Sequence, residues 1–433
     1  MIRCVEPSAV GGRIKAPASK SAMQRALACA AMAPGVSTIT NPTWCADSLA
    51  AMRVTTALGA SVERLDDRVV VRGGLFGSGS GTIVASCGES GLCLRMFSAI
   101  ASLSPVEVEL RGEGSLALRP VGMVEAPLSA LGVRCSTNGG LQPVRVRGPL
   151  HAGRVTVDGS ESSQFITGLL LALPMAGGDS VVTVERLASR GYVDLTLDIM
   201  RSFGADAVRD SSFSEFSVRG VPYGPTMYEV EGDWSGAAFL LVAGAIASGA
   251  QGLEVVGLQA GSSQPDRAVI DALKLAGARV EGVPGGYRVS AAPLRSFSFD
   301  ATDCPDLFPP LVALGSRCAG VTELRGASRL RAKESDRAAA LSEEFGKLGL
   351  RVDVDGDLMT VHGLGGGAAP GGPDLPRLSA GTVSSRGDHR IAMAAAVAAL
   401  SGAGPVLVDG AECVSKSWPE FFDMLDGIST GVS

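Results

Sequence analysis

A short segment recurs along this chain at an almost constant spacing, and this repeat restricts the fold more than any other feature. Each copy reads as an apolar residue, a glycine, a second apolar residue and a short charged stretch. The glycines are 73, 72, 73 and 72 residues apart, in ALGASVER at Gly59, ALGVRCS at Gly132, SFGADAVR at Gly204, LAGARVEG at Gly277 and KLGLRVDV at Gly349. A glycine just past an apolar helical stretch is the usual left-handed helix stop, because it has no Cβ. Each copy therefore predicts a helix, a glycine cap and a strand.

A second series of helix starts keeps step with the first. Apolar helices rich in Ala and Leu are predicted to begin after short polar segments at 19–21, 89–91, 162–164, 233–235, 306 and 388–390. The last interval is longer, and the segment GLGGGAAPGGPDLP accounts for the surplus. The 433 residues are therefore predicted to form six βαβαββ-like repeats, most simply as two domains of three repeats in an α/β or α+β fold.

The starts of these helices carry polar and cationic residues, although the helices themselves are apolar and predicted to be buried. Ser, Asp or Glu at such a position is explained by helix capping. Capping does not explain the nearby cations Lys20, Arg25, Arg95 and Arg390, which the positive end of a helix disfavours. If three helix starts gather in each domain and the domains face each other, the cleft between them would attract anions.

The composition excludes several classes of partner. The net charge of −6 argues against nucleic acid or an anionic membrane as the main partner. No secretory leader is visible, and the most apolar stretch, 237–250, is shorter than the ~20 residues a spanning helix needs. Nine cysteines include no C-x-x-C pair, and the three histidines lie far apart, so no local zinc site can form. We expect a soluble cytoplasmic protein with reduced thiols and no metal.

Five short segments combine cations with a candidate acid or base: 18–25, 115–120, 333–337, 388–390 and 415–416. Lys20 and Arg25 stand on neighbouring turns, which suits two anionic groups a few ångströms apart. The KESDR segment fits a functional cluster, and it fits a solvated helix face with ion pairs equally well. No phosphate-binding P-loop is present, and GGLFGSGSG at 73–81 predicts a hairpin turn.

A series of sequence pieces, in order along the chain, matches one known family: PASKSAMQRALACAAMA, GESGLCLRMF, LALRPVG, GSESSQFITGLLLALP, LASRGYVDLTLDIM, DCPDLFPPLVALGS, LRAKESDRAAALSEEFGKLG, GDHRIAMAAAVAAL and CVSKSWPEFF. By these pieces the chain resembles the 5-enolpyruvylshikimate-3-phosphate (EPSP) synthase family over essentially its whole length. SKSxxxR, KESDR and DHRIAM together are specific. The sister family that transfers enolpyruvate to UDP-N-acetylglucosamine shares the fold but lacks this combination.

The resemblance implies a two-domain inside-out α/β barrel with three βαβαββ repeats in each domain. One domain would span 15–227 and the other 1–14 with 228–433, hinged near 13–16 and 225–230. The domains would close on shikimate 3-phosphate and phosphoenolpyruvate, with no metal and no organic cofactor. The protein is expected to be a monomer, and glyphosate is a candidate inhibitor.

The resemblance also implies the site residues. Shikimate 3-phosphate would be held by Lys20, Ser21, Arg25, Ser162, Ser163, Gln164, Ser189, Asp306 and Lys333, with Tyr192 against the ring. Phosphoenolpyruvate would be held by Lys20, Gly91, Arg119, Gln164, Arg337, Arg390 and Lys416.

The reaction needs one base for the 5-hydroxyl proton of shikimate 3-phosphate and one acid for the enol methylene. Asp306 is the expected base and Glu334 the expected acid, and family geometry places Lys20 close enough to assist either transfer. The division of the proton transfers among these three residues stays open.

Two departures from the family pattern stand out. Glu89-Ser90-Gly91-Leu92 replaces the usual Asn-Ala-Gly-Thr, and a carboxylate at position 89 should repel phosphoenolpyruvate unless it pairs or turns away. Arg329 stands where some members place an Asn that contacts shikimate 3-phosphate. Leu92 and Met96 alter the helix behind Gly91, which leaves glyphosate sensitivity open.

Two other functions remain to be distinguished. One is an enolpyruvyl transferase with a different acceptor, and the other is a non-catalytic relative that binds phosphorylated metabolites. The presence of Lys20, Asp306 and Glu334 together argues against the binder, which needs no matched acid and base.

Overall fold

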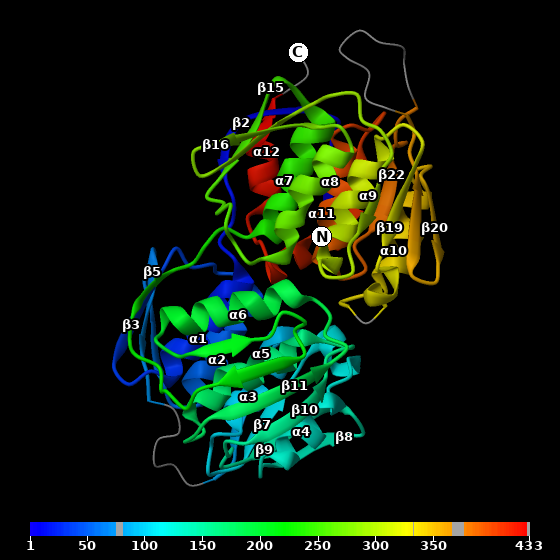
Figure 1. Ribbon diagram of the computed structural model, residues 1–433. Coiled ribbons are helices and arrows are strands. Elements are labelled where there is room, and N and C mark those ends of the chain that lie inside the picture. The colour runs from blue at the N-terminus through cyan, green and yellow to red at the C-terminus, as the bar shows by residue number, and fades with distance from the viewer. Residues whose placement is uncertain (75–80, 332, 366–375, 431–433) are drawn as a thin grey trace. The chain divides into compact units, whose positions relative to one another are not determined.

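The computed structural model describes residues 1–74, 81–331, 333–365 and 376–430, and Figure 1 shows its elements. Most of the turn expected at 73–81 and of the insertion at 363–376 lies outside these residues. The chain forms two compact units: unit 1 consists of residues 1–17 and 232–433, and unit 2 of residues 18–231. The hinge is expected near 13–16 and 225–230, but residues in both segments belong to paired strands. The two units divide slightly later in the sequence, after residues 17 and 231.

Unit 2 contains three repeats that share one strand order. The first strand pairs in parallel with the second, and the other two strands follow antiparallel. One repeat consists of β6 (Ile83–Ser86), α3 (Gly91–Ala101), β7 (Val108–Arg111), α4 (Glu125–Ala130), β8 (Arg134–Asn138) and β9 (Leu141–Arg147). The next consists of β10 (Arg154–Asp158), α5 (Ser163–Ala172), β11 (Ser180–Glu185), α6 (Arg190–Ser202), β12 (Ala207–Arg209) and β13 (Glu215–Val218).

The third repeat of unit 2 takes its first strand from the far end of the unit. It contains α1 (Lys20–Met32), β3 (Val36–Thr40), α2 (Ala46–Ala57), β4 (Ser61–Arg64) and β5 (Arg68–Arg72). The missing strand is β14 (Met227–Glu229), which lies parallel to β3 and restores the order seen in the other two sheets.

Unit 1 repeats the same plan with larger rearrangements. One repeat is continuous: β18 (Ser298–Asp300), α9 (Phe308–Ser316), β19 (Val321–Arg325), α10 (Arg337–Gly346), β20 (Arg351–Asp355) and β21 (Leu358–His362). In another, all of unit 2 is inserted between the first strand and the first helix: β2 (Ala9–Lys15), α7 (Trp234–Ala247), β15 (Ser248–Val256), α8 (Val269–Leu275), β16 (Arg279–Val283) and β17 (Gly286–Ser290).

The last repeat of unit 1 is assembled from both ends of the chain. It contains β22 (Gly381–Ser384), α11 (His389–Ala399), β23 (Val406–Asp409) and α12 (Phe421–Ile428), and its third strand is β1 (Ile2–Val5). The short β24 (Ser429–Thr430) joins the edge of β2. The described strands form six separate sheets, so the expected two-domain α/β fold with six repeats is confirmed, whereas a closed barrel is not seen.

The five repeat glycines end helices as the spacing predicts. Their φ angles are +113°, +86°, +85°, +86° and +85°, in the left-handed region that favours glycine. Each follows α2, α4, α6, α8 or α10 and precedes a strand.

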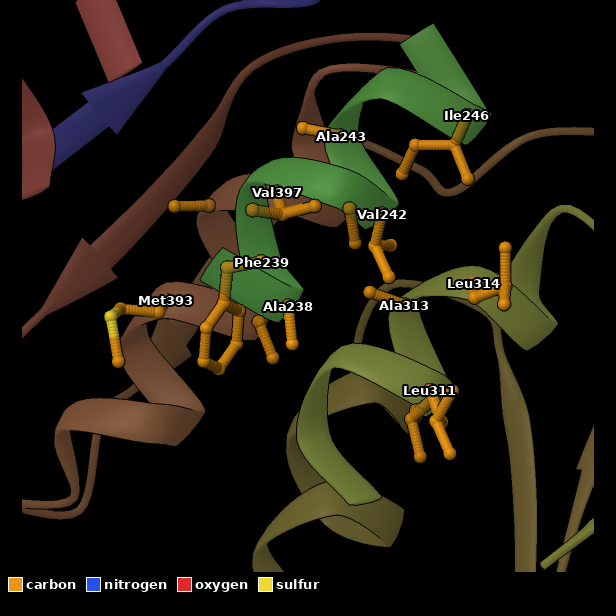
Figure 2. Packing of buried hydrophobic residues seen from close by; sticks show 14 of the residues in the cluster. Ala238, Phe239, Val242, Ala243, Ile246, Leu311, Ala313, Leu314, Met393 and Val397 are labelled. Carbon is orange, nitrogen blue, oxygen red and sulfur yellow. The ribbon is translucent and has the colours of Figure 1, made fainter. Parts of the chain in front are cut away.

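The predicted apolar helices form the two cores. Helices α1, α3 and α5 are buried in unit 2, and α7, α9 and α11 are buried in unit 1. Figure 2 shows Phe239 and Val242 of α7 among side chains of α9 and α11, such as Leu314 and Met393. Small alanines along α11 let its neighbours pack closely. Truncating a buried aromatic such as Phe239 to Ala would cost about 3–5 kcal/mol.

The starts of these helices are capped mostly as predicted. Ser19, Ser90, Ser162, Asp233 and Asp388 each accept a hydrogen bond from a backbone N–H in the first turn of the helix that follows. Asp306 is the exception: it lies inside a 3₁₀ turn (Pro305–Leu307) that precedes α9, and its side chain faces cations of other segments.

Within the described residues, no helix is both long and apolar enough to cross a membrane.

Candidate active site

Arg337 organises the candidate site residues of unit 1. It is the first residue of α10, and its side chain is 1% exposed. Its Nη1 lies 2.7 Å from Asp306 Oδ1, and its Nε lies 2.7 Å from Asp388 Oδ2. Its Nη2 donates to Glu334. One guanidinium thus holds three carboxylates from three segments, a geometry that a planar fork of five N–H groups allows.

Asp306 is surrounded by cations. Besides Arg337, Arg390 Nη2 lies 3.1 Å from Asp306 Oδ2, and Lys333 Nζ lies 3.7 Å from Asp306 Oδ1. Burial raises the pKa of Asp306, but the three cations outweigh it and hold that pKa well below its usual range. The carboxylate is therefore ionised at neutral pH.

The charged side chains around Asp306 also affect one another. Burial lowers the pKa of Lys333, although Asp306 opposes the shift. The Arg337 pKa is raised because Asp388, Glu334 and Asp306 outweigh the opposing effect of burial. Lys416 Nζ lies 4.0 Å from Glu334 Oε1.

We call these residues the Arg337 cluster: Asp306, Lys333, Glu334, Arg337, Asp388, Arg390 and Lys416. Four cations face three carboxylates, so the cluster carries an excess positive charge. The interpretation of KESDR as a solvated helix face is wrong, because Arg337 is buried and bonds to Asp306 and Asp388 of other segments, while Glu334 pairs with it.

In unit 2, the first turn of α1 carries Lys20, whose Nζ lies 2.9 Å from Asp47 Oδ2 on α2. The side chains of Lys20 and Asp47 are 13% and 8% exposed.

Arg25, further along α1, is buried among protein acceptors. Its guanidinium donates to Thr196, Thr167 and the carbonyl oxygens of Ser21 and Tyr192. It also lies 6.0 Å from the Tyr192 ring centroid, and burial lowers its pKa to about 10. Arg25 therefore joins α1, α5 and α6.

Three predicted residues meet around the start of α3. Arg95 Nη1 donates to Gln164 Oε1 at 2.9 Å, and Arg95 Nη2 donates to the Pro120 carbonyl at 2.6 Å. A Cβ on Gly91 would lie 2.9 Å from Nη1 of both Arg95 and Arg119. Glycine at position 91 thus lets two guanidinium groups reach the backbone at the N-terminus of a helix.

The hydroxyl residues of unit 2 lie at two further helix starts. Ser162 caps α5, Ser163 is its first residue, and Gln164 follows. Ser189 adopts a left-handed conformation (φ +59°) just before α6, and the Tyr192 N–H donates to its carbonyl.

The two departures from the family pattern are Glu89 and Arg329. Glu89 packs against Gly114, where an added Cβ would lie 2.4 Å from Glu89 Oε1. Burial lowers the pKa of Arg329, and Asp303 and Asp306 oppose the shift.

Each unit thus gathers its own share of the expected residues. Unit 1 brings together Asp306, Lys333, Glu334, Arg337, Arg390 and Lys416, and unit 2 carries Lys20, Ser21, Arg25, Gly91, Arg119, Ser162, Ser163, Gln164, Ser189 and Tyr192. The sequence-based selection omitted Asp47, Arg95 and Asp388, which contact selected residues directly. Arg95 and Asp388 carried a signal, since both lie at predicted helix starts, whereas Asp47 carried none.

Comparisons with known proteins point to one family over nearly the whole chain. The sequence model of the family described as EPSP synthase (3-phosphoshikimate 1-carboxyvinyltransferase) matches residues 5–425. A 3-phosphoshikimate 1-carboxyvinyltransferase of Clostridium kluyveri is 36% identical, over 97% of this chain and 95% of the relative. A protein of the same name from Aeropyrum pernix is 38% identical, over 97% and 94%.

Solved structures show the same likeness. An EPSP synthase from Acinetobacter baumannii superposes with a TM-score of 0.81 at 27% identity, covering 99% of this chain and 98% of that one. The enolpyruvyl transferase NikO from Streptomyces tendae shares the fold, with a TM-score of 0.75 at 18% identity and coverage of 99% and 97%.

Proposed function

Because the chain belongs to the EPSP synthase (3-phosphoshikimate 1-carboxyvinyltransferase) family, we infer that it transfers the enolpyruvyl group of phosphoenolpyruvate to shikimate 3-phosphate. The acceptor is the 5-hydroxyl, and the products are 5-enolpyruvylshikimate 3-phosphate and phosphate. The reaction belongs to the shikimate pathway, which leads to chorismate and the aromatic amino acids.

The observation that carries this proposal is the Arg337 cluster. Asp306 and Glu334 are bound by the same buried guanidinium, and the surrounding cations exceed the carboxylates in number. A site that only binds phosphorylated metabolites needs the cations but has no use for two carboxyl groups that oppose anion binding. An enolpyruvyl transfer needs both, because protons must leave one substrate and reach the other.

We assign the substrate contacts as follows. Ser162, Ser163 and Gln164 present hydroxyl, amide and backbone donors at the start of α5, where an anion such as the phosphate of shikimate 3-phosphate is favoured. Lys20, Ser21, Arg25, Ser189, Tyr192, Asp306 and Lys333 complete the shikimate 3-phosphate set. Gly91, Arg119, Gln164, Arg337, Arg390, Lys416 and Lys20 hold phosphoenolpyruvate.

The chemistry proceeds by addition and elimination. The 5-hydroxyl oxygen bonds to C2 of phosphoenolpyruvate as its proton leaves, and the C3 methylene takes up a proton. Phosphate then departs with the C2–O bond pair, a C3 proton is lost, and the enol double bond reforms. Cations placed before the reaction stabilise the charge on the departing phosphate, and each such donor is typically worth ~3 kcal/mol.

Substrate charge tunes the proposed base. In the free protein the cations around Asp306 keep its pKa low, which makes it a weak proton acceptor. Bound phosphate and carboxylate groups neutralise Arg390, Lys333 and Arg337, so their hold on Asp306 weakens and its basicity rises. Asp306 then takes the 5-hydroxyl proton. Glu334, between Arg337 and Lys416, delivers a proton to the methylene in its protonated form and regains one from C3 in the elimination, and Lys20 assists.

Three finer properties belong to the same proposal. We place the protein in the cytoplasm, which its nine free thiols support. We propose that it acts as a monomer. We also propose that glyphosate competes with phosphoenolpyruvate at Arg119 and the Arg337 cluster, which a competition assay at varied phosphoenolpyruvate would test.

Phosphate release tests the function directly. We expect release when shikimate 3-phosphate and phosphoenolpyruvate are both present, and none when either is omitted. Release with UDP-N-acetylglucosamine in place of shikimate 3-phosphate would indicate a different acceptor. Thermal stabilisation by both substrates without release would indicate a binding protein.

A further inference from the structure

We propose that Asp47, which lies outside the assigned set of substrate and proton-transfer residues, is a positioning residue that fixes the Lys20 ammonium for the reaction. The proposal rests on the proposed function of Lys20. Its observation is the direct contact of 2.9 Å between Lys20 Nζ and Asp47 Oδ2, made by two side chains that are largely withdrawn from water.

The elements around this pair hold both partners in place. Lys20 is the first residue of α1, and Asp47 lies in the first turn of α2, which packs against α1. On the other side, α2 packs against α3, the helix that begins at Gly91. The charge of Asp47 reaches that helix, because it contributes to the raised pKa of the Cys93 thiol, after burial and Cys87. Asp47 therefore lies where three helices that carry or flank site residues come together.

Stability alone does not account for this arrangement. An acidic residue in the first turn of a helix is favoured by the helix dipole, but that benefit is available at the surface, without the cost of burial. A buried ion pair loses hydration on both sides, and replacing it by apolar residues is often neutral or stabilising. The aspartate is also not the helix cap, because Cys45 holds that position.

The reaction gives the pair a use. A lysine ammonium is a point charge on a flexible four-carbon chain, so one turn of helix does not fix its position. Lys20 is assigned to both substrates and to proton transfer, which demands a defined position relative to each. A carboxylate behind the ammonium restricts the lysine rotamers and keeps the charge paired until the anionic substrates arrive. Displacing a catalytic group by about 1 Å can cost ~10²-fold in rate.

The test compares Asp47→Asn with wild type. Asparagine keeps the size and an acceptor oxygen but removes the charge that holds Lys20. We expect kcat to fall by ~10-fold or more, within the ~10²-fold that misplacement can cost, while the affinity for shikimate 3-phosphate changes less than about threefold. Asp47→Glu, which restores a carboxylate one methylene away, should recover part of the loss. Glu109→Gln is the matched control: Glu109 is as buried, lies in the same unit and pairs with Arg111 and Arg145, so its loss should leave kcat unchanged.

A double variant decides whether Asp47 acts through Lys20. If it does, Lys20→Ala/Asp47→Asn is no slower than Lys20→Ala, because the partner is already gone. The double variant carries neither buried charge, so this comparison stands even if Asp47→Asn alone folds poorly. The proposal is overturned if Asp47→Asn turns over within twofold of wild type, or if the double variant is at least about tenfold slower than Lys20→Ala. Absence of phosphate release by wild type would instead refute the proposed function.

Discussion

Asp306 shows how far a single residue can differ from its interpretation in the sequence. Its place before an apolar helix suggested a helix cap as the structural role, yet its side chain makes no capping bond and instead meets three cations. Those cations come from 27, 31 and 84 residues further along the chain, at Lys333, Arg337 and Arg390. Local spacing carries no information about such partners.

Replacing Asp306 by Asn separates binding from chemistry. The variant should fold and bind shikimate 3-phosphate within about tenfold of wild type, because the cations that attract the phosphate remain. It should lose at least ~10² in kcat, since an amide cannot take up the 5-hydroxyl proton. Steady-state kinetics and calorimetric titration measure the two effects. Asp300→Asn, in the same repeat but exposed, is the control, and turnover of Asp306→Asn within threefold of wild type would show that the base lies elsewhere.

The same carboxylate should shape the response to acid. Its pKa is lowered in the folded protein, so the stability it contributes is present above its unfolded value of ~3.9 and is lost as pH falls through the folded value. The urea midpoint of wild type should therefore fall more steeply below about pH 4 than that of Asp306→Asn. Parallel midpoints for the two proteins from pH 5 down to pH 3 would contradict the low pKa.

At the scale of elements, the repeat predicted helix ends better than it predicted sheet membership. The glycine stops and most of the caps depend on a few neighbouring residues, so their pattern is legible in the sequence. Three of the six sheets, in contrast, take a strand from a distant part of the chain: β14 joins β3, β2 joins β15, and β1 joins β23. These short strands have no distinctive pattern of their own, and pairing over such separations leaves no local mark.

The site residues show the same contrast between features set by neighbouring residues and contacts made between distant ones. Residues that lie at helix starts, such as Gly91, Gln164 and Arg390, could be selected from the sequence and the family motifs. Asp47 could not be selected in this way, because it is an ordinary acidic residue in the first turn of a helix. Only the packing of α2 against α1 brings it to Lys20.

Two glycines near helix ends should respond oppositely to the same substitution. Gly204 has φ +85°, and the nearest atom to an added Cβ would be 3.9 Å away, so Gly204→Ala should cost about 1 kcal/mol through backbone strain alone. Gly346 closes α10 without a left-handed φ and has open space for a Cβ. Gly346→Ala should be neutral or stabilising by up to about 1 kcal/mol. Urea denaturation measures both changes, and a stabilising Gly204→Ala would contradict the strain argument.

At the scale of the whole molecule, the expected substrate contacts are divided between the two units. A substrate that contacts residues of both units brings them together, since its anionic groups offset cations on each side. Small-angle scattering should therefore show a smaller radius of gyration with shikimate 3-phosphate, and adding phosphoenolpyruvate or glyphosate should not reverse the change. Unchanged dimensions with every ligand would contradict a hinged closure.

The insertion of unit 2 between β2 and α7 sets an order of events on the ribosome. Unit 2 is one continuous stretch, whereas unit 1 needs β1 to pair with β23 and β2 to pair with β15. At ~5–20 residues per second, roughly ten seconds or more separate the completion of residue 231 from the synthesis of β23. During that time unit 2 can fold on the nascent chain while β1 still lacks its partner strand β23. Translation thus delivers unit 2, which carries Lys20, before the last residues of the Arg337 cluster have been synthesised.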